Sequence, residues 1–527
     1  MTKKIQLLIP MSGQGTRYQA AGYKEPKPLI PVNGKPMISR LLENFPQSWP
    51  SFFVMAENHR NSELPTVLFK DRPNGQQIFI AKHTQGPSYA ALQAISHMDP
   101  DAAVFLSYCD YAMVWDSSRF SNFVEATDCD ACVISYRGYH AHYRSSLTYA
   151  YSRMIGEGVV EVKEKGSFTS NRENEFASSG GYYFKTAKLL KEAIQYQIAH
   201  EIALKGEYYS SLTVEALLRL RPQSHVRIFE IPGFFQWGTP EDLKIFEYWE
   251  QSYRAHHKFI GRERAEVDQV LMPMAGLGSR FTNITQIPKP FIPIAGGPMY
   301  QKALQTLPKG KNTVLITLDS VKSFLLAGDE TIISLSKTPP GQALSTEAGI
   351  TALTAEREVL VSSCDHGIVL DPTTWKKFKE FPDCDAAIFT IKGYPGCQTH
   401  PNSYAYVVTD ERGSFPEVKK VSVKVPISTN PSQDSLLVGT FWFRTAEILN
   451  QGIQELKKQE ILVNGEMYLD SVFELLIQKG LRVREISLSG YLCWGDPDSL
   501  AESLYWQEIF GGYRLEQRSK FPGVTLS

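Results

Sequence analysis

The sequence predicts an α/β protein built from two tandem copies of one domain. Three observations predict this fold class: apolar runs that alternate with helix-like stretches, a glycine-rich turn after the first apolar run of each half, and an internal repeat. Buried parallel strands read as continuous apolar runs, and the helices between them cover both faces of the sheet. We therefore expect a mostly parallel mixed sheet flanked by helices in each copy.

The internal repeat sets the domain organisation. Landmarks recur in the same order in both halves: GQGTR (13–17) and GLGSR (276–280), EPKPLIPVNGKPMI (25–38) and IPKPFIPIAGGPMY (287–300), LSYCDYAMVWD (106–116) and VSSCDHGIVLD (361–371), TDCDACVIS (127–135) and PDCDAAIFT (382–390), SGGYYFK (179–185) and VGTFWFR (438–444), GEYYSSL (206–212) and GEMYLDS (465–471), and FQWGTPEDL (235–243) and LCWGDPDSL (492–500). An internal repeat decides the architecture. We place the domains at 1–255 and 266–527, with a polar linker within 251–268.

The apolar runs and the stretches between them supply the elements of each copy. The first strands are IQLLIPM and DQVLMPM, and further strands are SFFVMA, AAVFLSY, ACVISY, NTVLITL, REVLVSS and AAIFTI. Helices are expected at SYAALQAISHM and STEAGITALTA. Ligands of such sheets bind at the carboxyl ends of the strands, where both glycine turns lie.

Composition narrows the class of protein. The chain has 527 residues, 43% of them hydrophobic and 21% charged, a net charge of −1 and seven cysteines. The charge gives no reason to expect nucleic acid or a membrane surface as a partner. Sparse cysteines favour a reducing compartment, and Pro10 ends the first apolar run too early for a signal peptide. We expect a soluble cytoplasmic protein.

The glycine turns indicate an anion site. Gly13 and Gly15 let a ligand approach the backbone, and successive backbone N–H groups form an anion-binding concavity. Arg17 adds a forked cation suited to phosphate. Lys27 stands between two prolines that stiffen its loop. Because the second copy repeats the arrangement, the residues predict a polyphosphate ligand.

The pattern G-x-G-[TS]-R followed by PKP resembles the signature of the sugar-1-phosphate and phospho-alcohol nucleotidyltransferases, the NDP-sugar pyrophosphorylase-like family. The resemblance covers each half almost end to end and implies two tandem Rossmann-like (GT-A-like) nucleotidyltransferase domains. It also implies the reaction: a substrate phosphate attacks the α-phosphorus of a nucleoside triphosphate, and pyrophosphate leaves. The products of this family serve as precursors of surface glycan, capsule or lipopolysaccharide.

The resemblance assigns roles to single residues. Arg17 would hold the departing pyrophosphate, Lys27 would neutralise the α-phosphate, and Asp110 would bind Mg²⁺, a hard cation that prefers oxygen ligands. The nucleotide would contact Gly13, Gln14, Gly15, Thr16, Gly86 and Ser88, and the acceptor Glu164, Lys165 and Gly180. The equivalents in the second copy are Gly276, Leu277, Gly278, Ser279 and Gly341 for the nucleotide, Arg280 and Lys289 for the reaction, Asp365 for the metal, and Lys424 and Gly439 for the acceptor.

Two departures from the family pattern concern the metal and the base. The place of a second metal-binding aspartate is taken by Gln236 and Cys493. Asp116 and Asp371 could assist, although a helix N-cap is the simpler interpretation. We expect CTP or UTP as the nucleotide. Ala81 stands where uridine- and deoxythymidine-specific members usually carry glutamine, which favours CTP.

The second copy leaves three interpretations open, because Val423 replaces Glu164 while the triphosphate cradle is intact. The copies could act on different substrates, one copy could be a structural or regulatory partner, or both could perform one reaction. A glycosyltransferase with a nucleotide-sugar donor is a rival hypothesis, but its D-x-D would be DCD at 128–130, before a strand. The expected partners are a nucleoside triphosphate and a phosphorylated sugar or alcohol; we also expect an intrachain pseudo-dimer of the domains, and homo-oligomers remain open.

Overall fold

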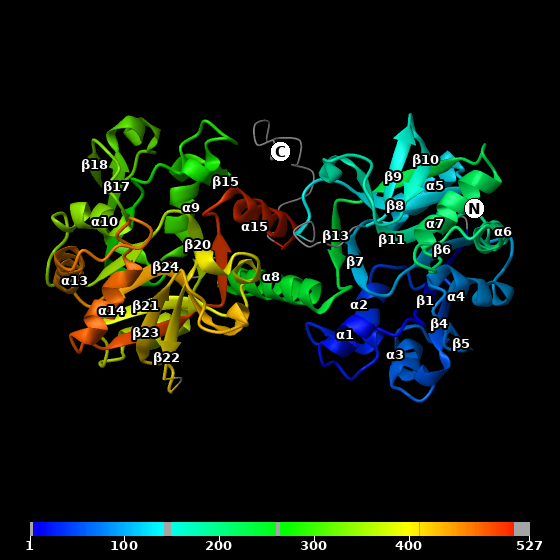
Figure 1. Cartoon of the computed structure of the whole chain (residues 1–527), viewed down its shortest axis with the longest axis horizontal. Coiled ribbons are helices and arrows are strands. Elements are labelled where there is room, and N and C mark those ends of the chain that lie inside the picture. The colour runs from blue at the N-terminus through cyan, green and yellow to red at the C-terminus, as the bar shows by residue number, and fades with distance from the viewer. Residues whose placement is uncertain (1–3, 142–148, 260–263, 411, 511–527) are drawn as a thin grey trace. The chain divides into compact units, whose positions relative to one another are not determined.

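The computed structural model describes residues 4–141, 149–259, 264–410 and 412–510, which form two compact units, Met1–Glu247 (unit 1) and Tyr248–Ser527 (unit 2) (Figure 1). Each unit contains one nine-stranded sheet with helices packed against it. The division between the units falls inside helix α8 (Pro240–Phe259), whereas the sequence analysis ended the first domain at residue 255.

Unit 1 alternates strands and helices along its length. Its strands are β1 Ile5–Pro10, β2 Pro31–Val32, β3 Lys35–Pro36, β4 Ser51–Ala56, β5 Gln76–Ile80, β6 Ala103–Ser107, β7 Tyr111–Val114, β8 Ala131–Tyr136, β9 Tyr151–Ile155, β10 Gly158–Lys163, β11 Phe176–Phe184, β12 Val226–Glu230 and β13 Gly233–Gln236. Its helices before α8 are α1 Thr16–Ala20, α2 Met37–Leu42, α3 Leu64–Asp71, α4 Pro87–Ala94, α5 Ser117–Thr127, α6 Ala187–Ala199 and α7 Ser210–Leu220.

The sheet of unit 1 is mixed. Its strand order is β10-β9-β11-β6-β1-β4-β5, with β8 paired to β11 and β12 paired to β8. The pairs β1–β4, β1–β6, β4–β5 and β8–β12 are parallel, and β11 runs antiparallel to β6 and β8. A separate antiparallel pair, β7–β13, joins Tyr111 to Gln236. These connections bring the ends of β1, β6 and β13 together.

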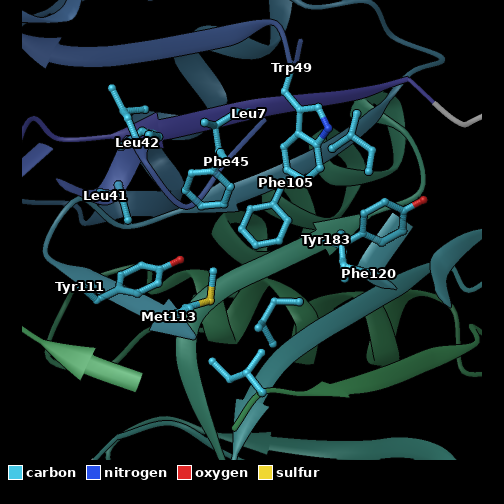
Figure 2. Close-up of a cluster of buried hydrophobic side chains, with 14 of the residues drawn as sticks. Leu7, Leu41, Leu42, Phe45, Trp49, Phe105, Tyr111, Met113, Phe120 and Tyr183 are labelled. Carbon is cyan, nitrogen blue, oxygen red and sulfur yellow. The ribbon is translucent and has the colours of Figure 1, made fainter. Parts of the chain in front are cut away.

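Alternating side chains of the central strand, β1, pack into two hydrophobic cores, one on each face of the sheet. Leu7 and Ile9 of β1 belong to one cluster, and Leu8 belongs to the other. The first cluster is aromatic: Phe105 packs against Phe45 and Phe120, with ring centroids 5.2 and 5.5 Å apart (Figure 2). The alternation follows from the period of two in a strand, so the continuous apolar runs predicted from the sequence are strands buried on both faces.

Unit 2 repeats this succession of elements. Its strands are β14 Glu266–Pro273, β15 Pro293–Ile294, β16 Gly297–Pro298, β17 Lys309–Leu318, β18 Thr331–Leu335, β19 Val359–Ser362, β20 His366–Val369, β21 Ala386–Ile391, β22 Ala405–Thr409, β23 Val418–Val423, β24 Ser435–Phe443, β25 Val483–Ser487 and β26 Gly490–Cys493. Its helices after α8 are α9 Met299–Thr306, α10 Gln342–Ile350, α11 Pro372–Lys379, α12 Gly396–Thr399, α13 Ala446–Lys458, α14 Asp470–Gln478 and α15 Pro497–Phe510.

The sheet of unit 2 has the same topology as that of unit 1. Its order is β18-β17-β14-β19-β24-β21-β25, and β22 pairs with β23 and β24. The pairs β14–β17, β14–β19, β17–β18 and β21–β25 are parallel, while β24 is antiparallel to β19 and β21. The predicted fold class, two mixed sheets flanked by helices, is therefore confirmed.

Asp116 and Asp371, which the sequence analysis considered as additional metal ligands, are helix N-caps. Asp116 accepts hydrogen bonds from the backbone N–H groups of Ser118 and Arg119 at the start of α5. Asp371 accepts one from the N–H of Thr373 at the start of α11. The simpler interpretation of these residues is confirmed. No helix within the described residues combines the length and apolar character that crossing a bilayer requires.

Candidate active site

The glycine turn of unit 1 follows β1 and leads into α1. Gly15 has φ +63°, a left-handed conformation, and a Cβ there would lie 3.1 Å from Cβ of Lys27. A Cβ at Gly13 would meet no atom within 4 Å. Gly15 is therefore required by the backbone itself, whereas the space beside Gly13 is open to a ligand.

Lys27 and Asp110 form an ion pair beside this turn. Lys27 Nζ donates to Asp110 Oδ2 over 2.5 Å and to the carbonyl of Gly238 over 3.3 Å. Pro26 and Pro28 fix the backbone on either side of the lysine. An ammonium group has three N–H donors, so one remains for a further acceptor.

A single cavity of about 600 Å³ contains most of the residues predicted for unit 1. It is lined by Gly13, Gln14, Gly15, Thr16, Arg17, Lys27, Gly86, Asp110, Glu164, Lys165 and Gly180. Arg17 is exposed, and its guanidinium makes no ion pair with any residue that the structure describes. The cavity thus combines exposed backbone at the glycine turn with the guanidinium of Arg17, which is available to bind an anion.

The part of the cavity predicted to bind the acceptor contains a half-buried carboxyl and a lysine. Glu164 accepts a hydrogen bond of 2.5 Å from Ser211 Oγ, and burial raises the pKa of its carboxyl above the usual value. Lys165 has φ +53°, and its ammonium donates to Tyr209 Oη over 2.5 Å and lies 4.4 Å from the centroid of that ring. The pair therefore offers a hydrogen-bonding carboxyl next to a cation.

Gln236 and Asp110 provide two oxygen atoms that fit Mg²⁺. Gln236 Nε2 donates to Asp242 Oδ2 over 2.9 Å, which fixes the amide, while Gln236 Oε1 is buried without a hydrogen-bond partner among the described residues. A Cβ added at Gly238 would lie 2.9 Å from Gln236 Nε2 and 3.5 Å from Asp110 Oδ2, so both side chains border one space. Mg²⁺ takes few protein oxygens and completes its shell with water and phosphate. Within the described ranges no cluster of three or more His, Cys, Asp or Glu side chains offers an alternative site.

Three residues predicted to bind the nucleotide or the acceptor make packing contacts within the protein that the sequence did not indicate. Ser88 is fully buried and its hydroxyl hydrogen-bonds Thr213 Oγ1 over 2.8 Å, so the structure does not bring it to the cavity. Gly86 has φ +90°, and a Cβ there would lie 2.8 Å from the backbone nitrogen of Tyr208. A Cβ at Gly180 would lie 2.8 Å from the ring of Tyr108, so this glycine makes room for a side chain of the protein.

His83 and Ser12 line the cavity and were missed by the sequence analysis. His83 Nδ1 accepts a hydrogen bond of 3.2 Å from the N–H of Gln85, so the proton is on Nε2, which donates to Ser12 Oγ over 2.9 Å. Burial lowers the pKa of His83, which favours this neutral form. His83 precedes the Gly86 segment by three residues, but the second copy has Thr338 there, so the repeat gave no signal.

Unit 2 reproduces the centre of this arrangement. Gly278 has φ +63°, and Lys289 Nζ donates to Asp365 Oδ2 over 2.6 Å and to the carbonyl of Gly495 over 3.0 Å. Burial acts against the charge of Lys289, but the Asp365 carboxylate outweighs it and holds the pKa of the ammonium above its usual value. Gly276, Leu277, Ser279 and Arg280 are exposed at the turn. Gly341 has φ +117° and abuts Met467, as Gly86 abuts Tyr208, and a Cβ at Gly439 would lie 3.4 Å from His366 Cε1.

The sulfur of Cys493 makes the second centre different. It takes the place of Gln236, and burial raises the pKa of its thiol. A protonated thiol is a poor ligand for Mg²⁺. Among the predicted metal ligands of unit 2, Asp365 alone fits this ion.

Part of unit 1 is similar in sequence to nucleotidyltransferases. Residues 7–167 match the family described as the MobA-like NTP transferase domain. A curated relative, the bifunctional protein GlmU of Herminiimonas arsenicoxydans, is 26% identical over 116 residues, which are 22% of this chain and 24% of the relative. The match thus spans about a quarter of that protein.

Solved structures of sugar-nucleotide enzymes are also similar to the chain. The nucleoside-diphosphate-sugar pyrophosphorylase of Vibrio cholerae is 17% identical, with a TM-score of 0.38, and covers 46% of this chain and 99% of its own. The inositol-1-phosphate CTP transferase of T. maritima is 15% identical, with a TM-score of 0.37, and covers 47% of this chain and 98% of its own.

Proposed function

We propose that unit 1 transfers a nucleotidyl group from a nucleoside triphosphate to the phosphate of a sugar phosphate or phospho-alcohol. The observation that supports this proposal is one cavity that contains the open glycine turn, the Lys27–Asp110 pair and the Glu164–Lys165 pair. The open glycine turn would receive a polyphosphate, and the Lys27–Asp110 pair would neutralise its charge. The Glu164–Lys165 pair would bind a phosphorylated acceptor that carries hydroxyl groups.

The reaction is an in-line displacement at phosphorus. An oxygen of the acceptor phosphate forms a bond to the α-phosphorus, the bond from the α-phosphorus to the bridging oxygen breaks, and pyrophosphate leaves with the bonding electrons. Such transfers depend on positioning and on neutralising charge rather than on covalent help from the protein. The N–H groups of the turn and Arg17 hold the triphosphate, and the third N–H of Lys27 reaches an α-phosphate oxygen. Lys165 holds the acceptor phosphate and Glu164 receives its hydroxyls.

Asp110 and Gln236 would hold Mg²⁺. The bound cation would neutralise phosphate charge that Lys27 alone does not balance. The amide of Gln236 is oriented for this role because Asp242, itself held by Thr239 Oγ1 at 2.7 Å, accepts its N–H. The chain would contribute one carboxylate oxygen and one amide oxygen, from two side chains that border the same space.

The nucleotide and the pathway are narrower parts of the proposal. We favour CTP or UTP, and Ala81 in place of glutamine favours CTP. The product would be an activated precursor for a surface glycan, capsule or lipopolysaccharide, made in the cytoplasm. These assignments follow from the family resemblance rather than from the geometry of the cavity.

The rival glycosyltransferase hypothesis needs a free D-x-D at the metal site. Asp128 pairs with Lys185 Nζ at 2.8 Å, and Asp130 accepts a hydrogen bond of 2.9 Å from the N–H of His225. Neither aspartate lines the cavity. The geometry therefore favours nucleotidyl transfer.

Pyrophosphate release tests the proposal. The intact chain with Mg²⁺ would be assayed with each of the four common nucleoside triphosphates against a panel of sugar phosphates and phospho-alcohols. We expect turnover with at least one pair, and Arg17→Ala should reduce the activity of unit 1 by about 10²-fold because a charged contact to the leaving group is lost. Arg119→Ala is the matched control, because this exposed arginine of α5 lies outside the cavity. Sugar transfer without pyrophosphate release, or no binding of any triphosphate, would refute the proposal.

A further inference from the structure

Unit 2 carries two cations, Arg280 and Lys424, at the positions that Arg17 and Lys165 hold in the repeat. Arg280 is exposed at the glycine turn, and Lys424 follows β23 with φ +63°. Lys424 Nζ donates to the carbonyl of Ser403 over 2.5 Å and lies 5.4 Å from the centroid of the Tyr468 ring, two residues before Asp470. Burial lowers the pKa of Lys424, and repulsion by the charge of Arg280 lowers it further. A bound anion would relieve that repulsion.

A carboxyl group has changed its place between the two units. In unit 1, Glu164 follows β10 and accepts a hydrogen bond from Ser211 of α7. The repeat aligns Glu164 with Val423 and Ser211 with Asp470, the first residue of α14. The carboxyl lost from the strand end is thus regained on the helix.

The first turns of α14 and α7 are held beside equivalent strands. Glu474 Oε2, four residues after Asp470, accepts a hydrogen bond of 3.2 Å from the N–H of Val421. In the same way, Glu215 Oε2 accepts one of 2.9 Å from the N–H of Val162. Asp470 therefore lies near the end of β23 that leads to Lys424.

Burial raises the pKa of the Asp470 carboxyl, and the charge of Lys424 acts to lower it. In unit 1, burial raises the pKa of Glu164 and Lys165 acts to lower it. Val423 packs partly against the apolar core of unit 2 and offers no polar atom of its side chain. Each unit therefore has a half-buried carboxyl near its predicted acceptor lysine, presented from a different element.

We propose that unit 2 is a second nucleotidyl-transfer site, which takes a different phosphorylated sugar or polyol whose hydroxyl is received by Asp470. Lys424 binds the acceptor phosphate, and the Lys289–Asp365 pair lies at the α-phosphate. The reaction has the same balance as in unit 1: an acceptor phosphate oxygen bonds to the α-phosphorus and pyrophosphate departs. The inference rests on the proposed function for the type of reaction. The acceptors differ because a carboxyl on the helix meets a hydroxyl at a different position from a carboxyl on the strand.

Counting nucleotide sites separates this inference from the proposed function. Equilibrium dialysis of the full chain with Mg²⁺ and radiolabelled CTP, UTP, ATP or GTP should give two sites for the intact chain. Arg17→Ala should leave one strong site, and Arg17→Ala/Arg280→Ala should leave none. One site in the intact chain and none in Arg17→Ala would overturn the inference but spare the proposed function. No site in the intact chain would overturn both.

Asp470→Asn tests the acceptor assignment in the Arg17→Ala chain. With the acceptor that gives pyrophosphate release there, the substitution should raise KM for the acceptor about tenfold or more, because a charge-assisted hydrogen bond is lost, with little change in kcat. The matched control is Asp498→Asn, an exposed residue of α15. An unchanged KM would overturn the role of Asp470.

Loss of nucleotide binding in Asp470→Asn would indicate that unit 2 has not folded. In that case a swap of the carboxyl positions provides the decisive test. Val423→Glu/Asp470→Ser gives unit 2 the arrangement of unit 1, and bound CTP reports that the unit is folded. We expect the swapped unit to gain the acceptor preferred by unit 1 and to lose its own. Retention of its original acceptor, or one shared acceptor for both units before the swap, would overturn the proposal.

Discussion

The centres of the two units are nearly the same, whereas their surroundings differ. Both units pair a lysine with an aspartate and aim the lysine at a backbone carbonyl, Gly238 in unit 1 and Gly495 in unit 2. Next to this pair stands the amide of Gln236 in one unit and the thiol of Cys493 in the other. The lysine–aspartate pair is therefore constant between the two units, whereas the side chain next to it varies.

Hydroxyl and carboxyl groups have also exchanged places at the helix that follows the site. In unit 1, Thr239 Oγ1 donates to Asp242 over 2.7 Å at the start of α8. In unit 2, Ser499 Oγ donates to Asp496 over 2.8 Å at the start of α15. The hydrogen bond is kept, but the carboxyl moves from the first turn to the position before the helix. This exchange shows that the fold fixes where this polar pair sits rather than which partner is acidic.

The largest expected effect is at the shared centre. Lys27→Met should lower kcat of unit 1 about 10²–10³-fold, because transition-state charge at phosphorus loses its preorganised cation. Lys289→Met should do the same to the reaction of unit 2, and pyrophosphate release with each unit's own substrates measures both. Lys70→Met, at an exposed position of α3, is the control. A loss below tenfold in Lys27→Met would mean that the pair with Asp110 is structural.

The metal ligands provide the next test. Cys493→Asp should lower the Mg²⁺ concentration for half-maximal activity of unit 2 about 10-fold, because a hard oxygen replaces a thiol next to Asp365. Binding of Mn²⁺ followed by electron paramagnetic resonance in the Arg17→Ala chain gives a readout that does not depend on turnover. No change in Mn²⁺ affinity would show that residue 493 does not face the cation.

Asp242 should make the stability of unit 1 depend on pH. Burial raises the pKa of its carboxyl from 3.8 to about 6, so the folded unit binds the proton more tightly than the unfolded chain does. This contribution to stability is present below about pH 4 and is lost as the pH rises to about 6, a change on the order of 2–3 kcal/mol. Asp242→Asn should therefore gain in Tm relative to the wild type as the pH is raised from 4 to 7. A constant difference in Tm across this range would contradict the assignment.

The smallest effects are expected at the helix caps, where the units do not differ. Asp116→Ala and Asp371→Ala should each lower the free energy of unfolding by about 1 kcal/mol, because backbone N–H groups lose their acceptor. Thermal unfolding measures the loss, and pyrophosphate release at 25 °C should stay at the wild-type rate for Asp116→Ala. A large loss of activity there would restore Asp116 as a metal ligand.

Much of the fold could be predicted from the sequence, because the repeat supplied two independent copies of each pattern. The strand ending at Pro10 and its counterpart ending at Pro273 were both recognisable as buried runs before a glycine turn. The glycine turn and the PKP segment each consist of residues that are neighbours in the sequence, so both can be recognised without a structure. The residues they identified, such as Arg17 and Lys27, line the cavity.

The features of the site that were not predicted depend on contacts between residues far apart in the sequence. The ion pair of Lys27 with Asp110 joins positions 83 residues apart, and no local pattern announces it. The inward turn of Ser88 depends on Thr213 of another helix. The role proposed for Asp470 could not be predicted because its counterpart in the repeat, Ser211, is not acidic, and only the packing of α14 against β23 places Asp470 near the strand end.

The contact between Lys27 and the carbonyl of Gly238 has a consequence for synthesis and folding, since it closes a loop of 211 residues. Loop closure of this length carries an entropic cost that must be met before the contact contributes, and proteins rich in such contacts fold slowly. A nascent chain that has emerged only through residue 167 lacks Tyr209, Gln236 and Gly238, which line the cavity. The reaction centre of unit 1 therefore forms late, after nearly all of the unit has left the ribosome.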